Sequence, residues 1–98
     1  MSEPIRLPLQ PLFPLGRVLA TPGALALMDE FNISGAALLR RHVTGDWGDI
    51  DPADRGLNEE ALRDGLRIFS VYGTSDERLW IITEADRSAT TILRPEDY

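Results

Sequence analysis

The chain has 98 residues, with ten arginines, no lysine, sixteen carboxylates, one histidine and no cysteine, and its formal net charge is −6. The absence of cysteine excludes a disulfide framework, a thiol nucleophile and a thiolate zinc site, and the absence of lysine excludes a Schiff base and a phosphate-loop lysine. This length fits a single domain, and the acidic charge disfavours direct binding to nucleic-acid phosphates.

The negative charge is concentrated in one segment. Residues 1–45 carry a net charge of +1, residues 46–64 carry −5 and residues 65–98 carry −2. The N-terminal residues lack the uninterrupted apolar run of a signal peptide or a membrane-spanning helix. We therefore expect a cytoplasmic protein with an acidic surface formed by the middle of the chain.

The N-terminal segment is rich in proline, with four of the seven prolines among the first fourteen residues. Proline fixes its own φ and favours an extended conformation in the residue before it, so residues 1–15 are predicted to form an extended arm. Leu9, Leu12 and Phe13 would then cover part of the core of an α+β domain over residues 16–98. The prolines also recur at every third position in part of the arm, which matches the polyproline ligands of other proteins.

Two short antiparallel helices are expected after a brief apolar run at residues 18–20. The first begins at Thr21, an N-cap residue that is followed by proline at the first helical position. The second begins after the N-cap residue Ser34 and ends near Gly45. Its predicted buried side consists of Leu38, Leu39, His42 and Val43.

Residues 46–65 indicate a loop followed by a third helix. Asp51 and Pro52 form a second pair of cap residue and proline, and Asn58 with the two glutamates after it forms another helix start. One kinked helix over residues 52–64 and a short turn followed by a helix over residues 59–64 therefore both remain open, and Gly65 ends either of them.

The last third is predicted to be a β-meander with strands at residues 66–72, 79–83 and 88–93, because these segments are rich in β-branched and aromatic residues. If Thr83 pairs with Ser88 and Tyr72 with Arg78, the alternation of side chains defines two faces. The face under the helices then holds Phe69, Val71, Leu79, Ile81 and Ile92. The other face holds Ile68, Tyr72, Trp80, Ile82 and Leu93, and it needs cover from the arm or from a partner.

We therefore expect an α+β fold, in which two or three short helices pack on a three-stranded antiparallel meander, with an added N-terminal strand as an option.

The densest polar cluster follows the second predicted helix and contains His42, Asp46 and Asp49, with Trp47 between the two aspartates. One imidazole and two carboxylates suit a divalent metal ion. The same aspartates, together with Asp51, can instead cap turns and helix starts while Trp47 fills the core. A loop that binds a protein partner is the third interpretation.

A second cluster, Glu84, Asp86 and Arg87, follows the predicted strand at residues 79–83. Two carboxylates after a strand resemble the site of a metal-dependent nuclease, but such sites usually add a lysine, which this chain lacks. We favour a hairpin turn in which Asp86 accepts backbone N–H groups and Arg87 pairs with Glu84 or a neighbouring acid. A serine triad has no support either, because His42 is the only imidazole and no serine lies in a strand-turn-helix elbow.

Two stretches of the chain resemble a known family. They are His42 with Gly45-Asp46-Trp47-Gly48-Asp49, followed by Asp54, Asn58, Ala61-Leu62 and Gly65, and the stretch from Trp80 to Leu93. From Val18 to Tyr98 the chain resembles a family of small bacterial proteins described as plasmid-related, some of which are labelled as a type I restriction-modification subunit. The resemblance implies a bacterial source and carriage on mobile elements, and it implies no catalytic residue. It adds weight to a joint site formed by the two polar clusters.

We therefore expect a small interaction protein of a mobile element that binds a protein partner through its acidic surface, for example to inhibit a host defence complex by imitating nucleic-acid charge. The expected partner-binding residues are Asp46, Trp47, Asp49, Asp51, Asp54, Tyr72, Trp80, Glu84, Asp86 and Arg87. No catalytic residue, metal, cofactor or membrane contact is assigned. The first alternative is a metal-dependent hydrolase or nuclease that uses His42, Asp46, Asp49, Glu84 and Asp86. The second is an assembly factor that forms a homodimer through its sheet.

Overall fold

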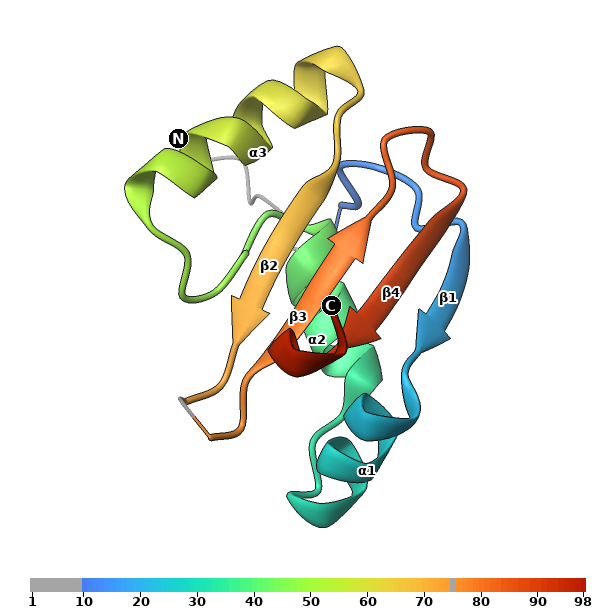
Figure 1. Ribbon diagram of the computed structural model, residues 1–98. Helices are drawn as coiled ribbons and strands as arrows, with labels where there is room; N and C mark the ends of the chain where they lie inside the picture. Colours follow the sequence, from blue (N-terminus) through green and yellow to red (C-terminus); the bar gives the residue numbers. More distant parts are fainter. Residues whose placement is uncertain (1–9, 75) are drawn as a thin grey trace, which may run out of the picture.

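The computed structural model describes residues 10–74 and 76–98 (Figure 1). The elements in chain order are β1 (Arg17–Ala20), α1 (Pro22–Glu30), α2 (Gly35–Val43), α3 (Pro52–Asp64), β2 (Ile68–Tyr72), β3 (Leu79–Thr83), β4 (Ala89–Leu93) and the short 3₁₀ helix η1 (Pro95–Asp97). The predicted α+β fold is confirmed. None of the described helices is long and apolar enough to cross a membrane. Residues 1–9 of the predicted arm, including Leu9, lie outside the described residues.

The sheet has four strands in the order β1-β4-β3-β2. Strands β2, β3 and β4 form the predicted antiparallel meander, and β1 joins the outer side of β4 in parallel. Parallel pairing needs a long connection, which the helices and the meander supply. The optional N-terminal strand is therefore present, and it makes the sheet mixed.

The predicted register between β2 and β3 is wrong. Tyr72 pairs with Leu79 instead of Arg78, because the connection continues through Arg78 before β3 begins. A shift of one residue turns a strand over. Strand β2 therefore directs Ile68, Ser70 and Tyr72 toward the helices, and Phe69 and Val71 toward the opposite face.

The predicted register between β3 and β4 is also wrong, but its consequence is smaller. Thr83 pairs with Thr90 instead of Ser88. The turn closes with a backbone hydrogen bond from Glu84 to Ala89 at 3.0 Å, so the strand starts later than expected. A shift of two residues keeps every side chain of β4 on its predicted face.

The helix starts follow the predicted capping signals. The side chains of Thr21, Ser34 and Asp51 each accept a backbone N–H from the first turn of α1, α2 and α3, at 2.8–3.1 Å. The third helix is continuous from Pro52 to Asp64, which decides between the two open alternatives in favour of the longer helix. It ends at Gly65, whose φ of 68° lies in the left-handed region that glycine adopts without strain.

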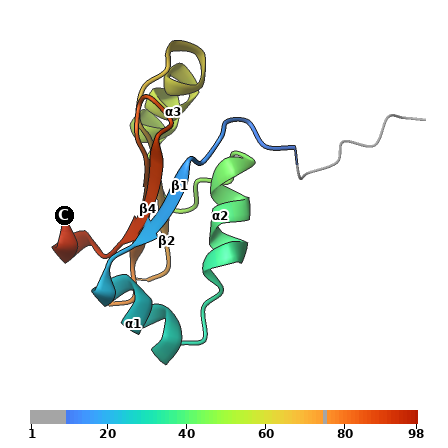
Figure 2. The ribbon, with the colours of Figure 1, turned by 90° about the vertical axis from the view of Figure 1, so that its right-hand side faces the viewer.

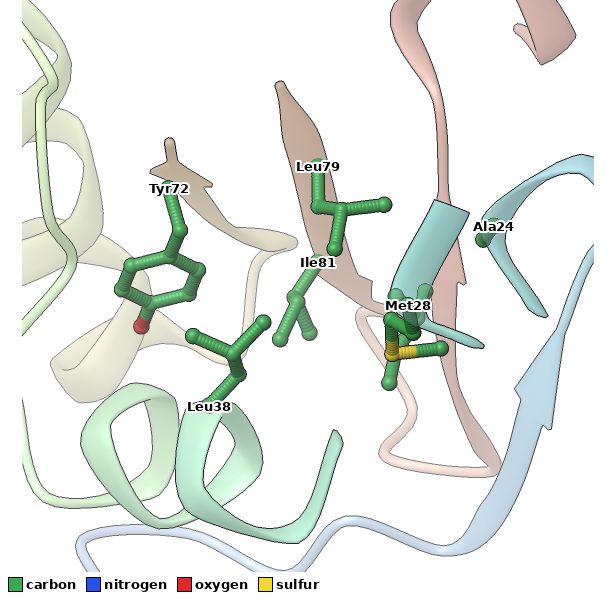
Figure 3. Close-up of a cluster of buried hydrophobic side chains, with 7 residues drawn as sticks. Ala24, Met28, Leu38, Tyr72, Leu79 and Ile81 are labelled. Carbon is green, nitrogen blue, oxygen red and sulfur yellow. The ribbon is translucent and has the colours of Figure 1, made fainter. Parts of the chain in front are cut away.

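The helices α1 and α2 pack against one face of the sheet, and η1 lies on the other (Figure 2). The buried core between the helices and the sheet is shown in Figure 3 and consists of Ala24, Met28, Leu38, Tyr72, Leu79, Ile81 and Ile92. The described part of the chain places no α-helix on the face that carries η1, and we call it the open face.

A second buried cluster joins the third helix and the arm to the sheet. It contains Phe13, Trp47, Ala61 and Ile68. Phe13 is only 6% exposed, as expected of an arm residue that covers the core, whereas Leu12 is 51% exposed. Among residues 10–15 of the arm, Phe13 is therefore the buried anchor, and Leu15 packs against the same cluster.

Candidate functional site

The helix α3 is attached to the rest of the protein by a narrow contact. Asn58 and Ala61 are its buried residues, and most of its other side chains face solvent. The amide of Asn58 donates from Nδ2 to the Phe69 carbonyl at 2.7 Å and accepts from the Phe69 N–H at 3.0 Å. The Asn58 amide therefore makes the two hydrogen bonds with the outward-facing N–H and C=O of Phe69 that a neighbouring strand would otherwise make. The helix consequently lies at the edge of the sheet and presents a broad surface, on which Leu57 is 58% exposed.

Arg87 has a structural role that its sequence position did not reveal. Its guanidinium donates to the carbonyl oxygens of Ala61 at 3.0 Å and of Leu66 at 2.5 Å, beside the C-terminus of α3, and also to those of Glu84 and Ala85. The C-terminus of a helix carries a partial negative charge, so a cation is favourable there. The predicted pairing of Arg87 with a carboxylate is therefore wrong, and its guanidinium ties α3 to the β3–β4 turn.

The carboxylates of the second predicted cluster have local partners. Glu84 lies 3.7 Å from the guanidinium of Arg67, before β2. Asp86 accepts the Ser88 N–H at 3.0 Å, which confirms the predicted turn contact, and hydrogen bonding from Ser88 lowers the pKa of Asp86. Both acids therefore have roles within the protein: Glu84 pairs with the residue before β2, and Asp86 stabilises the turn before β4.

Asp46 and Asp49, before α3, are each paired with an arginine. Asp46 lies 2.7 Å from Arg41, and this hydrogen bond lowers the pKa of the Asp46 carboxyl. Asp49 lies 3.4 Å from Arg78, which is the residue that the corrected register places in the loop. Both carboxylates remain partly accessible, but their charges are matched within the protein.

Asp51 and Asp54 belong to the first turn of α3. The Asp51 carboxylate is the N-cap and accepts the Asp54 N–H at 2.8 Å. Asp54 follows in the first turn, where the helix dipole favours a negative charge. The acidity of this part of the segment therefore supports the helix.

The carboxylates in the second half of α3 are different. Glu59, Glu60 and Asp64 are exposed, and in the described ranges 10–74 and 76–98 none of them has a hydrogen-bond or ion-pair partner within the protein. The helix dipole does not favour acids toward a C-terminus. Their position near the end of the predicted helix could have shown from the sequence that these three residues are not N-terminal caps. The partner-binding residues predicted from the sequence did not include them.

Two predicted binding residues, Trp47 and Tyr72, belong to the core. Each is only 4% exposed. The Tyr72 hydroxyl donates to the Asp46 carbonyl at 2.6 Å, and burial raises the pKa of Tyr72 to about 12. The Trp47 carbonyl accepts the Val71 N–H at 3.0 Å. The interpretation of Trp47 as a core residue is confirmed, and neither ring is exposed for contact with a partner.

His42 is fully buried between α2 and the sheet, and hydroxyl groups occupy both of its nitrogens. Nδ1 lies 2.5 Å from the Ser70 hydroxyl, and Nε2 lies 2.8 Å from the Thr83 hydroxyl. Thr83 contacts Thr90 at 2.7 Å, and Thr90 donates to the Leu15 carbonyl.

Because a carbonyl can only accept, the hydrogen-bond directions from Leu15 to Nε2 of His42 are determined. Thr90 donates to the carbonyl of Leu15, so Thr83 must donate to Thr90, and His42 must donate from Nε2 to Thr83. Burial lowers the pKa of His42 to about 4, so the imidazole is neutral and Nδ1 accepts from the Ser70 hydroxyl.

The joint site predicted from the two polar clusters does not form. Asp46 and Asp49 lie near Tyr72, at one end of β2, whereas Glu84 lies near Arg67, at the other end. A strand of this length separates the two ends by about 13 Å. Across the part of the chain that the structure describes, no three His, Asp or Glu side chains are grouped so as to hold a metal ion. The metal-dependent hydrolase therefore lacks the site it was predicted to use.

Trp80 lies on the open face within a row of aromatic rings. Its ring centroid is 5.1 Å from that of Phe69 and 5.8 Å from that of Tyr98, both in edge-on geometry. Arg67 and Ile82 complete a pocket of about 260 Å³ around these rings. None of the residues that line this pocket belongs to α3.

Two features of the described surface could therefore contact a ligand. One is the unpaired negative charge on α3, and the other is the exposed apolar area on α3 and on the open face. Comparison with protein-family models, with curated proteins and with solved structures finds no match.

Proposed function

We propose that the protein binds the basic surface of a protein partner through α3. The observation that carries this proposal is the group of three unpaired carboxylates, Glu59, Glu60 and Asp64, on a helix whose outer surface is almost entirely exposed. Charges that are already matched within a protein gain little from a new partner, whereas unmatched charges gain the full interaction and speed the encounter.

The partner that suits this surface is a protein that uses arginine and lysine to hold nucleic-acid phosphates. A row of carboxylates on a helix can occupy such a surface and block it. A host defence complex is the partner that we propose, in keeping with the resemblance to plasmid-related proteins. Leu57, exposed on the same helix, supplies apolar area for the centre of the contact.

The proposal is tested with two variants of equal charge. Glu59→Gln, Glu60→Gln and Asp64→Asn together neutralise the proposed surface. Asp29→Asn, Glu30→Gln and Asp76→Asn remove the same number of charges from exposed positions outside α3. Proteins captured from a bacterial extract by the wild-type chain are identified, and their affinities for all three chains are measured at several salt concentrations.

We expect the α3 variant to lose at least about tenfold in affinity and most of the salt dependence, and the control variant to keep both. Equal losses in the two variants would show that only net charge matters, and unchanged binding by the α3 variant would exclude α3. Thermal unfolding should be nearly unchanged in both, because none of the substituted side chains makes a hydrogen bond or ion pair with another described residue.

A further inference from the structure

The two edges of the sheet differ in whether their outward-facing backbone groups have hydrogen-bond partners. At the β2 edge, the Asn58 amide satisfies the backbone of Phe69, and the segment around Gly48 satisfies that of Val71, through the Trp47 carbonyl at 3.0 Å and the Asp49 N–H at 2.8 Å. At the opposite edge, β1 has no such cover in the described part of the chain. Figure 1 shows β1 as the outermost element on its side. Proteins generally protect such edges, so an uncovered one needs an explanation.

The register of β1 identifies the backbone groups that face outward. Arg17 donates to Ser88 at 3.0 Å and Thr21 donates to Ile92 at 3.0 Å, so the odd-numbered residues of β1 bond to β4. The N–H and C=O groups of Val18 and Ala20 consequently point away from the sheet. No bulge or proline interrupts these four residues, and Val18 and Leu19 are 49% and 41% exposed.

We infer that β1 pairs with β1 of a second copy of this chain, in antiparallel orientation about a two-fold axis at Leu19. In this register, Val18 of one copy exchanges two backbone hydrogen bonds with Ala20 of the other, and the symmetric pair does the same. The outward-facing N–H and C=O groups of Val18 and Ala20 in both copies are then all satisfied. The two Leu19 side chains lie directly opposite each other, in the position where strands approach most closely.

The charges around β1 match in this register. Arg17 lies two positions from the axis and therefore faces Thr21 of the second copy. The Thr21 hydroxyl is bonded to Asp97 at 2.6 Å, and Glu96 is exposed beside it in η1. Arg94 contacts both carboxylates, at 3.1 Å and 3.9 Å, so the three side chains together keep a net charge of −1 for the arginine of the other copy. Arg17, Leu19 and Thr21 share the open face, which is also the side of η1, so each arginine approaches the acidic η1 of the other copy. This complementarity favours a second copy over a peptide of arbitrary charge.

The pairing leaves α3 accessible. In Figure 2, where the β1 edge faces the viewer, no described element lies in front of the strand. The helix α3 lies beyond β2, at the far edge of each sheet, so the dimer would carry one acidic helix at either end. A contact made by one four-residue strand is smaller than the interfaces of permanent dimers, and we expect a dimer that dissociates on dilution.

The absence of cysteine permits a direct test on the full chain. Leu19→Cys introduces a single thiol, and the two thiols of the proposed dimer lie across a non-hydrogen-bonded pair, about 4.5 Å apart between Cα atoms, within the range for a disulfide. Mild oxidation should yield a covalent dimer rapidly. Leu25→Cys on α1 is the matched control, because Leu25 is more exposed, at 55%, but lies outside the pairing. Equal rates of crosslinking for the two variants would refute the inference.

Sedimentation of the unlabelled chain supplies the second readout. The wild-type protein should change from monomer to dimer between about 10 µM and about 500 µM. Val18→Pro removes one outward N–H that the monomer does not use, and Leu19→Lys places two positive charges face to face. Each should weaken the dimer by at least about tenfold, while Leu25→Lys should leave it unchanged. A wild-type chain that remains monomeric, or a dimer that tolerates both β1 variants, would overturn the proposal.

Discussion

The buried histidine should make the protein lose stability as the pH falls from 7 toward 4. In the folded protein, His42 donates from Nε2 to Thr83 and accepts from Ser70, and no carboxylate contacts either nitrogen. Protonation would add a hydrogen at Nδ1, where Ser70 already donates, and would bury a charge without a counter-ion. The folded state therefore holds the neutral imidazole, whereas the unfolded chain is free to take up the proton.

The size of the effect follows from the two pKa values. The pKa of His42 is about 4 in the folded protein, against an ordinary value of 6.5. Above the ordinary value neither state binds the proton, so the full stability is present; below it only the unfolded state gains the proton, until the folded pKa is reached. Between about pH 7 and about pH 4.5 the free energy of unfolding should fall by about 2.5 kcal/mol.

Two measurements check this prediction. Because His42 is the only histidine, its imidazole signals in NMR spectra are unambiguous, and they should report the Nε2-protonated tautomer and no titration of the folded protein near pH 6.5. Urea unfolding followed by tryptophan fluorescence gives the free energy at each pH. His42→Gln should flatten the dependence in this range at some cost in stability. A folded-state midpoint near 6.5, or the same pH dependence in the variant, would refute the reasoning.

Three further predictions concern the attachment of α3, and urea unfolding measures each. Arg87→Gly should destabilise the protein by about 2 kcal/mol through the loss of the carbonyl contacts, even though glycine relieves a φ of 61°; a more stable variant would contradict this role. Asn58→Leu should cost about 2–3 kcal/mol, because it leaves both backbone groups of Phe69 unpaired; Asn58→Asp keeps the acceptor but buries a charge against the Phe69 carbonyl, so at pH 7 it should cost at least as much, and a smaller cost for the Asp variant would contradict this role of the amide. Gly56→Ala should stabilise the protein by about 0.5–1 kcal/mol, since a Cβ there meets no atom within 4 Å; a loss would indicate a contact that the structure does not contain.

The helix starts could be predicted from the sequence because capping is local. Thr21, Ser34 and Asp51 each bond to a backbone N–H three residues later, so the signal lies within one turn. The strand register could not be predicted in the same way. The connection after Tyr72 includes Arg78, whose ion pair with a distant loop is invisible in the local pattern, and one additional loop residue was enough to turn β2 over.

The candidate site shows the same limit. Arg87 and Asn58 bond to backbone groups more than ten positions away in the chain. Every residue has a backbone carbonyl, so the sequence does not show which carbonyl a distant side chain will contact. His42 was placed correctly on the buried side of α2, but its partners Ser70 and Thr83 come from two strands whose predicted register was wrong. The sequence could predict which side chains are able to form hydrogen bonds or ion pairs, whereas the partner of each side chain depended on tertiary structure.

The acidic segment shows why net charge alone could not identify a binding surface. Its carboxylates divide into two groups with opposite physical roles. Asp46 and Asp51 are held by an arginine and by a helix N-terminus, so neutralising them would weaken the fold and any binding defect would be ambiguous. Glu59, Glu60 and Asp64 lie where the helix gains nothing from negative charge, and they have no partner in the described chain. If the acidity serves a partner, only the second group can reveal it, because only there can charge be removed while stability is kept.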